Sequence, residues 1–191
     1  MMSNDIYVSL ASIEAALGRL DRKVLLDSLQ DGIPSGIVRS ALAQVGLESF
    51  PELEALYAWC NGTDVEGAKL GEIWIFPGFY FLPLEDAILN YRTFVGDLRW
   101  QVGWLPLFAD GGGDFYFVDL GTELEYPIRR FRLEESEHPV EYGSLQEMIT
   151  TLATAFEREI FYVNQVGSLW DDTSRFVALA AELNPEIDWW R

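Results

Sequence analysis

The chain is poor in the residues on which most catalytic and metal sites depend. Its 191 residues include one cysteine, Cys60, and one histidine, His138. A single cysteine cannot form a disulfide within the chain, and zinc sites and Cys–His pairs normally draw on more thiolate and imidazole than this. We therefore predict no metal and no cofactor. A Cys60–His138 dyad is arithmetically possible, but the position of Cys60 on an apolar helical stripe favours a buried, unreactive thiol.

Basic residues are also scarce. Thirteen lysines and arginines are set against thirty-one aspartates and glutamates, which gives a net charge of −18. Such an excess repels nucleic-acid phosphates and anionic lipids, and it attracts basic surfaces. We therefore expect a protein partner with a basic surface and no nucleic acid.

Long apolar runs are absent as well. No uncharged apolar stretch approaches the roughly 20 residues that are needed to cross a bilayer. The N-terminal segment MMSNDIYVSLASIEAALGRL lacks the basic lead and the uninterrupted apolar core of a secretory signal. We therefore expect no membrane association and a cytoplasmic location.

The most distinctive stretch that the chain does contain runs from Trp104 to Leu120. Apolar residues lead up to the turn Asp110-Gly111-Gly112-Gly113-Asp114 and resume after it. Glycines reach positive φ without steric cost, and the aspartates can bond to the turn amides, so the pattern predicts a β-hairpin. Both faces of the second strand are apolar, which places this strand inside a sheet. Pro106 cannot donate to a ladder, so we expect the first strand at an edge or beside a bulge.

Apolar residues at three- and four-residue intervals predict helices before and after a group of strands. Helices are expected over residues 6–20 with a continuation to 29, and over 35–45, 51–60, 83–95, 144–160 and 172–183. Ser49 and Ser144 are expected to cap two of them, and Asn61-Gly62 to end another. Further strands are expected over residues 72–76, 79–82, 126–133 and 140–142.

This order of elements predicts the fold class. Helices, then clustered strands with one inserted helix, then helices again, are typical of an α+β layout. We expect a single domain over residues 1–191, with a mainly antiparallel sheet of five or six strands flanked by N-terminal and C-terminal helices. The tail contains Trp189 and Trp190, which are expected to cover the core.

The acidic and glycine-rich residues also raise three other interpretations. A phosphate-binding loop would be followed by Gly-Lys-Ser/Thr and a helix, whereas a strand is expected after the triple glycine. Asp110, Asp114 and Asp119 could suggest a hard cation, but their spacing matches no EF-hand loop. The many carboxylates leave open a hydrolase that uses two of them, which predicts one concave site with a raised-pKa acid.

Three segments, taken in order, resemble the SUKH superfamily, which includes the fungal cell-wall synthesis regulator and many bacterial immunity proteins. They are Leu56–Gly62, the aromatic stretch that ends in 81–87, and Trp104–Asp119. The likeness covers about residues 35–160, and residues 171–191 form a C-terminal helical extension. The motif residues are Trp104, Pro106, Asp110, Gly111, Gly112, Gly113, Asp114, Asp119, Asn61 and Gly62. The resemblance implies a noncatalytic α+β domain, so no catalytic residue is expected.

The resemblance also implies binding to another protein, and in bacteria most often the neutralisation of a cognate toxin, such as a nuclease. The acidity agrees, because a nuclease that grips phosphate presents a basic surface that an acidic protein can occupy. We therefore predict an immunity protein that acts by occlusion, with a regulatory adaptor of the cell-wall-regulator type as the alternative. The motif residues are expected to serve structure first, and partner contacts to lie on loops such as residues 64–71 and 134–141.

Overall fold

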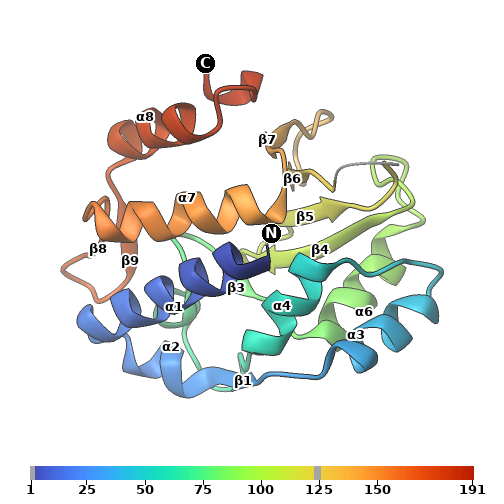
Figure 1. Ribbon diagram of the computed structural model, residues 1–191, viewed down its shortest axis with the longest axis horizontal. Coiled ribbons are helices and arrows are strands. Elements are labelled where there is room, and N and C mark those ends of the chain that lie inside the picture. Colours follow the sequence, from blue (N-terminus) through green and yellow to red (C-terminus); the bar gives the residue numbers. More distant parts are fainter. Residues whose placement is uncertain (1–2, 123–125) are drawn as a thin grey trace.

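The computed structural model describes residues 3–122 and 126–191. At its centre lies a five-stranded antiparallel sheet in the order β3-β4-β5-β6-β7 (Figure 1). The strands are β3 Tyr80–Phe81, β4 Trp104–Ala109, β5 Phe115–Asp119, β6 Ile128–Phe131 and β7 Val140–Tyr142. The predicted α+β class, the antiparallel sheet and the hairpin around residues 110–114 are confirmed.

The central strand of this sheet is β5, with β4 on one side and β6 on the other. On one face Phe115 contacts Phe94, the last residue of helix α6 (Leu84–Phe94). On the other face Tyr116 contacts Phe79. Because apolar groups cover both faces, every residue of β5 is buried, which confirms that this strand lies inside the sheet.

The proline of the hairpin lies at a shift in strand register. Pairing between β4 and β5 is irregular between Pro106 and Phe108. The prediction of an edge or a bulge at this proline is therefore confirmed by the bulge, and β3, which pairs with Phe108 and Ala109, does not extend to Pro106. The bulge allows a residue without an amide hydrogen to stand inside a sheet.

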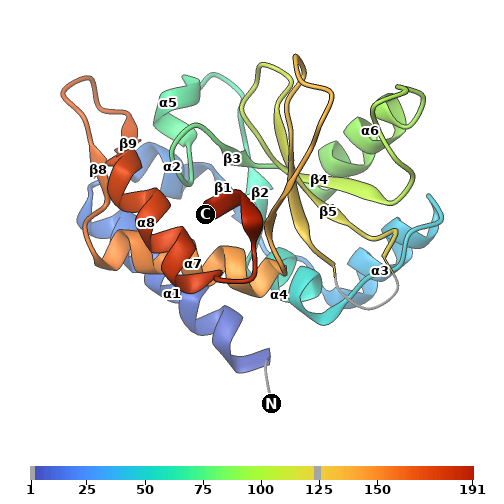
Figure 2. The ribbon, with the colours of Figure 1, turned by 90° about the horizontal axis from the view of Figure 1, so that it is seen from above.

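Helices cover both faces of the sheet. Helix α6 lies on one side, and α1 and α7 lie on the other (Figure 2). The remaining helices are α1 Ser3–Arg19, α2 Lys23–Ser28, α3 Ser35–Ala43, α4 Pro51–Trp59, α5 Leu70–Ile73, α7 Leu145–Glu157 and α8 Thr173–Leu183, with a 3₁₀ turn η1 at Asp188–Trp190. Helix α7 packs between α1 and α8 (Figure 1). Within the described residues, none of these helices has both the length and the apolar content that a bilayer span requires.

The two predicted serine caps have different outcomes. Ser144 caps α7 as predicted, because its Oγ accepts the backbone N–H of Glu147 at 3.1 Å. The cap predicted at Ser49 is wrong. The serine stands one residue too early, since Phe50 occupies the N-cap position before Pro51, and the buried Ser49 Oγ has no hydrogen-bond partner.

The first helix is shorter than its apolar pattern predicts. Helix α1 ends at Arg19, and Asp21 then adopts a φ of +54°, which stops the helix before α2 begins. The predicted continuation is helical over Lys23–Ser28, but it is separated from α1 and does not include Leu29. Residues Leu29–Asp31 instead form β1, which pairs antiparallel with β2, Cys60–Thr63.

Two other predictions are corrected around β2 and β3. Asn61-Gly62 does not end a helix, because α4 ends at Trp59 and both residues belong to β2. The strand predicted over 72–76 is largely wrong, since the helical turn α5 extends to Ile73. Only Phe76 bridges to Phe79 there, which closes a tight turn.

The C-terminal part contains a second hairpin that the apolar periodicity did not predict. Strands β8, Phe161–Val163, and β9, Leu169–Asp171, pair antiparallel directly after α7. Helix α8 follows and confirms the last predicted helix. In the tail, Trp190 is buried as predicted, whereas 44% of Trp189 is exposed.

Candidate functional site

The turn at residues 110–114 is held by one aspartate. Asp110 Oδ1 accepts the backbone N–H groups of Gly112, Gly113 and Asp114 at 2.7, 3.0 and 3.0 Å. Gly111 and Gly113 adopt φ values of +84° and +113°, which explains why glycine stands there. Since these three amides already have a carboxylate acceptor, the turn does not offer them to a phosphate.

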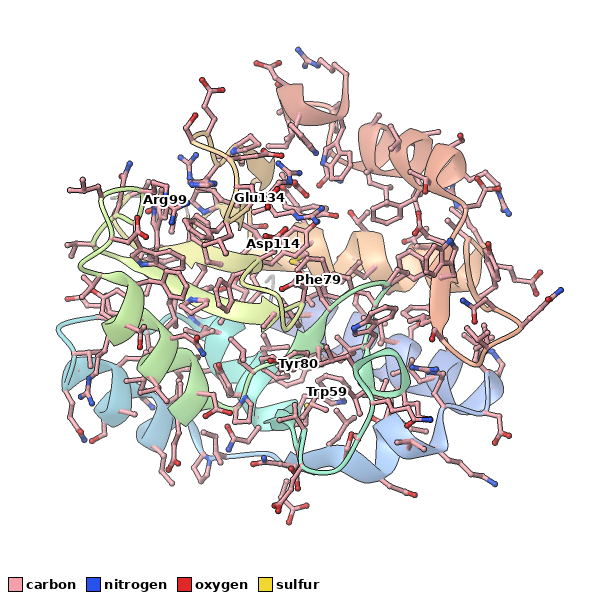
Figure 3. All side chains as sticks on the ribbon, turned by 180° about the vertical axis from the view of Figure 1, so that it is seen from behind. Trp59, Phe79, Tyr80, Arg99, Asp114 and Glu134 are labelled. Carbon is pink, nitrogen blue, oxygen red and sulfur yellow. The ribbon has the colours of Figure 1, made fainter. Side chains whose placement is uncertain are left out.

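The second aspartate of the turn ties it to the end of β6. Asp114 Oδ1 accepts the N–H of Leu133 at 3.0 Å, and its Oδ2 lies 3.6 Å from the guanidinium of Arg130. Arg130 also stacks on the ring of Phe79, which is seen close to Asp114 in Figure 3. Both aspartates of the motif therefore stabilise the backbone around them.

Asp119 and Trp104 are bound into the other end of the same hairpin. Asp119 is buried, and its Oδ2 accepts a hydrogen bond from Arg129 Nε at 3.0 Å. The other oxygen, Oδ1, accepts the N–H of Gly121 at 3.1 Å. Trp104 stacks on Phe117 with ring centroids 4.3 Å apart. No cluster of three potential metal-ligating side chains occurs among residues 3–122 and 126–191.

Asn61 and Gly62 position helix α6. Asn61 Oδ1 accepts the N–H of Leu84 at 3.0 Å, so it caps a helix whose own N-cap residue, Pro83, provides no side-chain acceptor. Gly62 has a φ of +76°, and a Cβ built on it would lie 2.2 Å from the nitrogen of Pro83. Only glycine fits this close backbone approach.

One buried carboxylate lines a cavity of about 400 Å³ between the sheet and the C-terminal helix. Glu141 Oε2 accepts the hydroxyl hydrogen of Tyr116 at 2.7 Å, and Oε1 lies 2.9 Å from Arg132. Burial raises the pKa of Glu141 above its usual value, although these neighbours act in the opposite direction. The hydrolase hypothesis requires such an acid. Both oxygens are held by neighbours, however, and the Nε1 group of Trp190 donates to the Glu141 carbonyl, so this residue anchors the tail.

Cys60 and His138 line separate hollows. Cys60 is buried, as predicted, but at the start of β2 and not on a helix, and burial raises the pKa of its thiol to about 12. It borders a hollow with Trp59, whereas His138 borders one with Trp104. Burial, together with nearby Arg99, lowers the pKa of His138. The two residues therefore form no nucleophile–base pair, since the thiolate is strongly disfavoured.

The residue that sequence reasoning missed is Arg22. Its guanidinium donates to the carbonyls of Gly167 at 2.6 Å, Gly71 at 2.8 Å and Glu72 at 3.0 Å. These bonds join the tip of the β8–β9 hairpin to α5 and to the end of the loop over residues 64–71. No signal in the sequence singles it out, because Arg19 and Lys23 are basic residues in the same charged stretch.

Comparison with known protein families identifies the family of this chain. Residues 49–151 match the model of the SMI1 / KNR4 family (SUKH-1). No curated protein matches the chain. Every motif residue described above lies inside the matched segment, while α1 to α3 and the β8–β9 hairpin lie outside it. The chain belongs to the SMI1 / KNR4 family (SUKH-1).

Proposed function

We propose that the chain is a noncatalytic protein-binding module of the immunity type, which neutralises a cognate toxin in the cytoplasm by covering a basic surface of that toxin. Membership of the SMI1 / KNR4 family supports a protein-binding role. We further propose that residues 1–191 act as one unit, in which the family-like core, about residues 35–160, carries the extension over residues 171–191.

The distribution of charge is the observation that carries this proposal. In the described part of the chain, eight of the thirteen basic side chains lie within 4.0 Å of a carboxylate. Their charges are thereby compensated locally, while many carboxylates face solvent. Exposed acidic residues include Glu14, Asp31, Asp64, Glu66, Glu85, Glu134, Glu137, Glu159 and Glu186. The surface is therefore suited to a basic partner.

The polar groups of the motif support a structural role, because they are already hydrogen-bonded within the protein. The carboxylates of Asp110, Asp114 and Asp119 accept backbone or arginine hydrogens. Asn61 caps a helix. A side chain that already satisfies the backbone around it is a poor general acid or base, because proton transfer to a substrate would break those bonds.

Co-expression with a candidate toxin tests this function. The toxin-like gene nearest to the gene for this chain would be expressed alone and together with the chain, and bacterial growth would be measured. We expect the chain to restore growth and to bind the purified toxin domain with nanomolar affinity in calorimetry. The association rate should fall as salt is raised, since opposite charges steer the encounter.

Two outcomes would contradict the proposal. One is a purified toxin domain that neither binds the chain nor loses toxicity in its presence. The other is stable copurification with several unrelated host proteins and no toxin, which the regulatory adaptor predicts instead.

A further inference from the structure

The β8–β9 hairpin exposes two large aromatic side chains on one face. Tyr162 and Trp170 are directly opposed in the antiparallel register, so their side chains project from the same side of the hairpin. Their exposed fractions are 44% and 50%. At the tip, 84% of Val166 is exposed. Aromatic residues left partly in water on a regular element are the usual anchors of protein interfaces.

The hairpin is held rigid although it has only two strands. Asn164 Oδ1 accepts the N–H groups of Val166 and Ser168 at 3.1 and 3.0 Å, which fixes the turn. Arg22 also holds the tip in place, because its guanidinium donates a hydrogen bond to the carbonyl of Gly167. On the opposite face, Phe161 packs against Phe156 and Phe176. A surface that is already ordered loses less conformational entropy on binding than a flexible loop.

The hairpin itself carries acidic side chains and no basic one. The arginines that flank it have other partners, since Arg158 pairs with Glu182 and Arg175 donates to backbone carbonyls. Between residues 159 and 174 the chain carries Glu159, Asp171 and Asp172 and no basic residue. Through Arg22 the tip is also tied to Gly71, at the end of a loop that carries exposed Asp64, Glu66 and Lys69. Aromatic anchors within an acidic rim complement a basic surface that has an apolar centre.

We propose that the β8–β9 hairpin is the docking surface for the basic partner, with Tyr162 and Trp170 as its anchors. This assignment rests on the proposed function. It places the specificity of the interaction on a segment outside residues 49–151, which match the family. A family scaffold can then serve different partners when an appended hairpin differs.

Four single variants test the surface against the toxin domain used in the co-expression experiment. Trp170→Ser and Tyr162→Ser should each raise the dissociation constant by about 30-fold, because interface tryptophans and tyrosines are frequent hot spots. Tyr7→Ser on α1 and Leu89→Ser on α6 are matched controls, since these side chains are also about half exposed. The controls should bind like the parent chain, and the urea midpoints of all four should remain unchanged.

A second pair of variants tests the charge of the partner. Val166→Glu should accelerate association several-fold at low salt and Val166→Lys should slow it, with both effects fading at high salt. Equal binding by the parent and by Trp170→Ser would overturn the docking surface and leave the proposed function intact. A parent chain that does not bind the toxin domain would overturn both. Faster association of Val166→Lys would overturn the basic partner.

Discussion

Two of the antiparallel hairpins of this protein, the first formed by β4–β5 and the second by β8–β9, use the same local chemistry in opposite surroundings. In each turn a side-chain oxygen of the first residue, Asp110 or Asn164, accepts backbone amides from the residues that follow. All the strand residues of the first hairpin are buried. The second hairpin exposes Tyr162 and Trp170. The hydrogen bonds within the turns therefore explain how both hairpins form, whereas the different burial of their strands distinguishes their roles.

The difference follows the boundary of the family match. The β4–β5 hairpin lies inside residues 49–151, at the centre of a sheet covered on both faces. The β8–β9 hairpin lies outside, where one face packs on Phe156 and Phe176 and the other meets solvent. The first hairpin is therefore part of the core of the fold, whereas the second presents one of its faces to solvent.

The sharpest test of this comparison replaces one aromatic residue in each hairpin. Phe117→Ala should lower the free energy of unfolding by about 3–5 kcal/mol, because it leaves a cavity beneath Trp104. Trp170→Ala should change it by less than about 0.5 kcal/mol, as is usual for a surface position. Urea unfolding followed by circular dichroism measures both values.

A volume-preserving variant serves as the control for this pair. Phe117→Leu retains most of the buried apolar volume and should lose less than about 1.5 kcal/mol. Equal losses of unfolding free energy for Phe117→Ala and Trp170→Ala would mean that the second hairpin belongs to the folding core. The two hairpins would then not differ in their contribution to stability.

Removing the arginine that anchors the second hairpin should have the next largest effect. Arg22→Met leaves three carbonyls without their charged donor and should lower the free energy of unfolding by about 2–4 kcal/mol. Hydrogen exchange should accelerate at the amides of Gly167 and Ser168. The amides of β5 should keep their protection when the parent and the variant are compared at equal free energy of unfolding. Uniform acceleration in both hairpins would show that Arg22 stabilises the whole molecule and not the hairpin tip.

The two turn residues allow a direct comparison at smaller cost. Asp110→Ala removes a charged acceptor from three amides and should lower the free energy of unfolding by about 2 kcal/mol. Asn164→Ala removes a neutral acceptor from two amides and should lower it by about 1 kcal/mol. Thermal unfolding of the two variants at equal concentration ranks them. The reverse order would indicate that the Asp110 carboxylate is strained or poorly solvated in the native turn.

These contrasts also show why the fold could be predicted only in part. The β4–β5 hairpin was predictable because its signal is local, with glycines and aspartates between two apolar runs. Helices α7 and α8 were predictable because their apolar stripes are long. The β8–β9 hairpin was missed because three-residue strands carry too little periodicity, and its turn contains a single glycine, Gly167.

Long-range pairing explains the remaining errors. The residue that follows the break after Arg19, Arg22, is bonded to carbonyls that lie about 50 and 145 positions away in the chain, and no local pattern indicates these partners. Asn61 was predicted to end its own helix, whereas it caps a helix that begins at Leu84. The motif residues could therefore be identified from the sequence, but the hydrogen-bond partners of their side chains could not.

The smallest predicted effect is a pH dependence that belongs to the central sheet, where the loop between β6 and β7 places His138 against the first hairpin. His138, the one histidine of the chain, contacts the ring of Phe131 and meets Trp104 edge-on. Burial and Arg99 lower its pKa below the ordinary 6.5, so the unfolded chain takes up this proton more readily than the native one. The stability that neutral His138 contributes is therefore complete above pH 6.5 and is lost as the pH falls through the native pKa.

His138→Asn keeps an acceptor near the N–H of Arg132 but does not titrate. Its unfolding free energy should fall less between pH 7.5 and 5 than that of the parent chain. Trp170→Ala should run parallel to the parent, because its hairpin contains no histidine, and a flattened profile for Trp170→Ala would break the separation between the two regions.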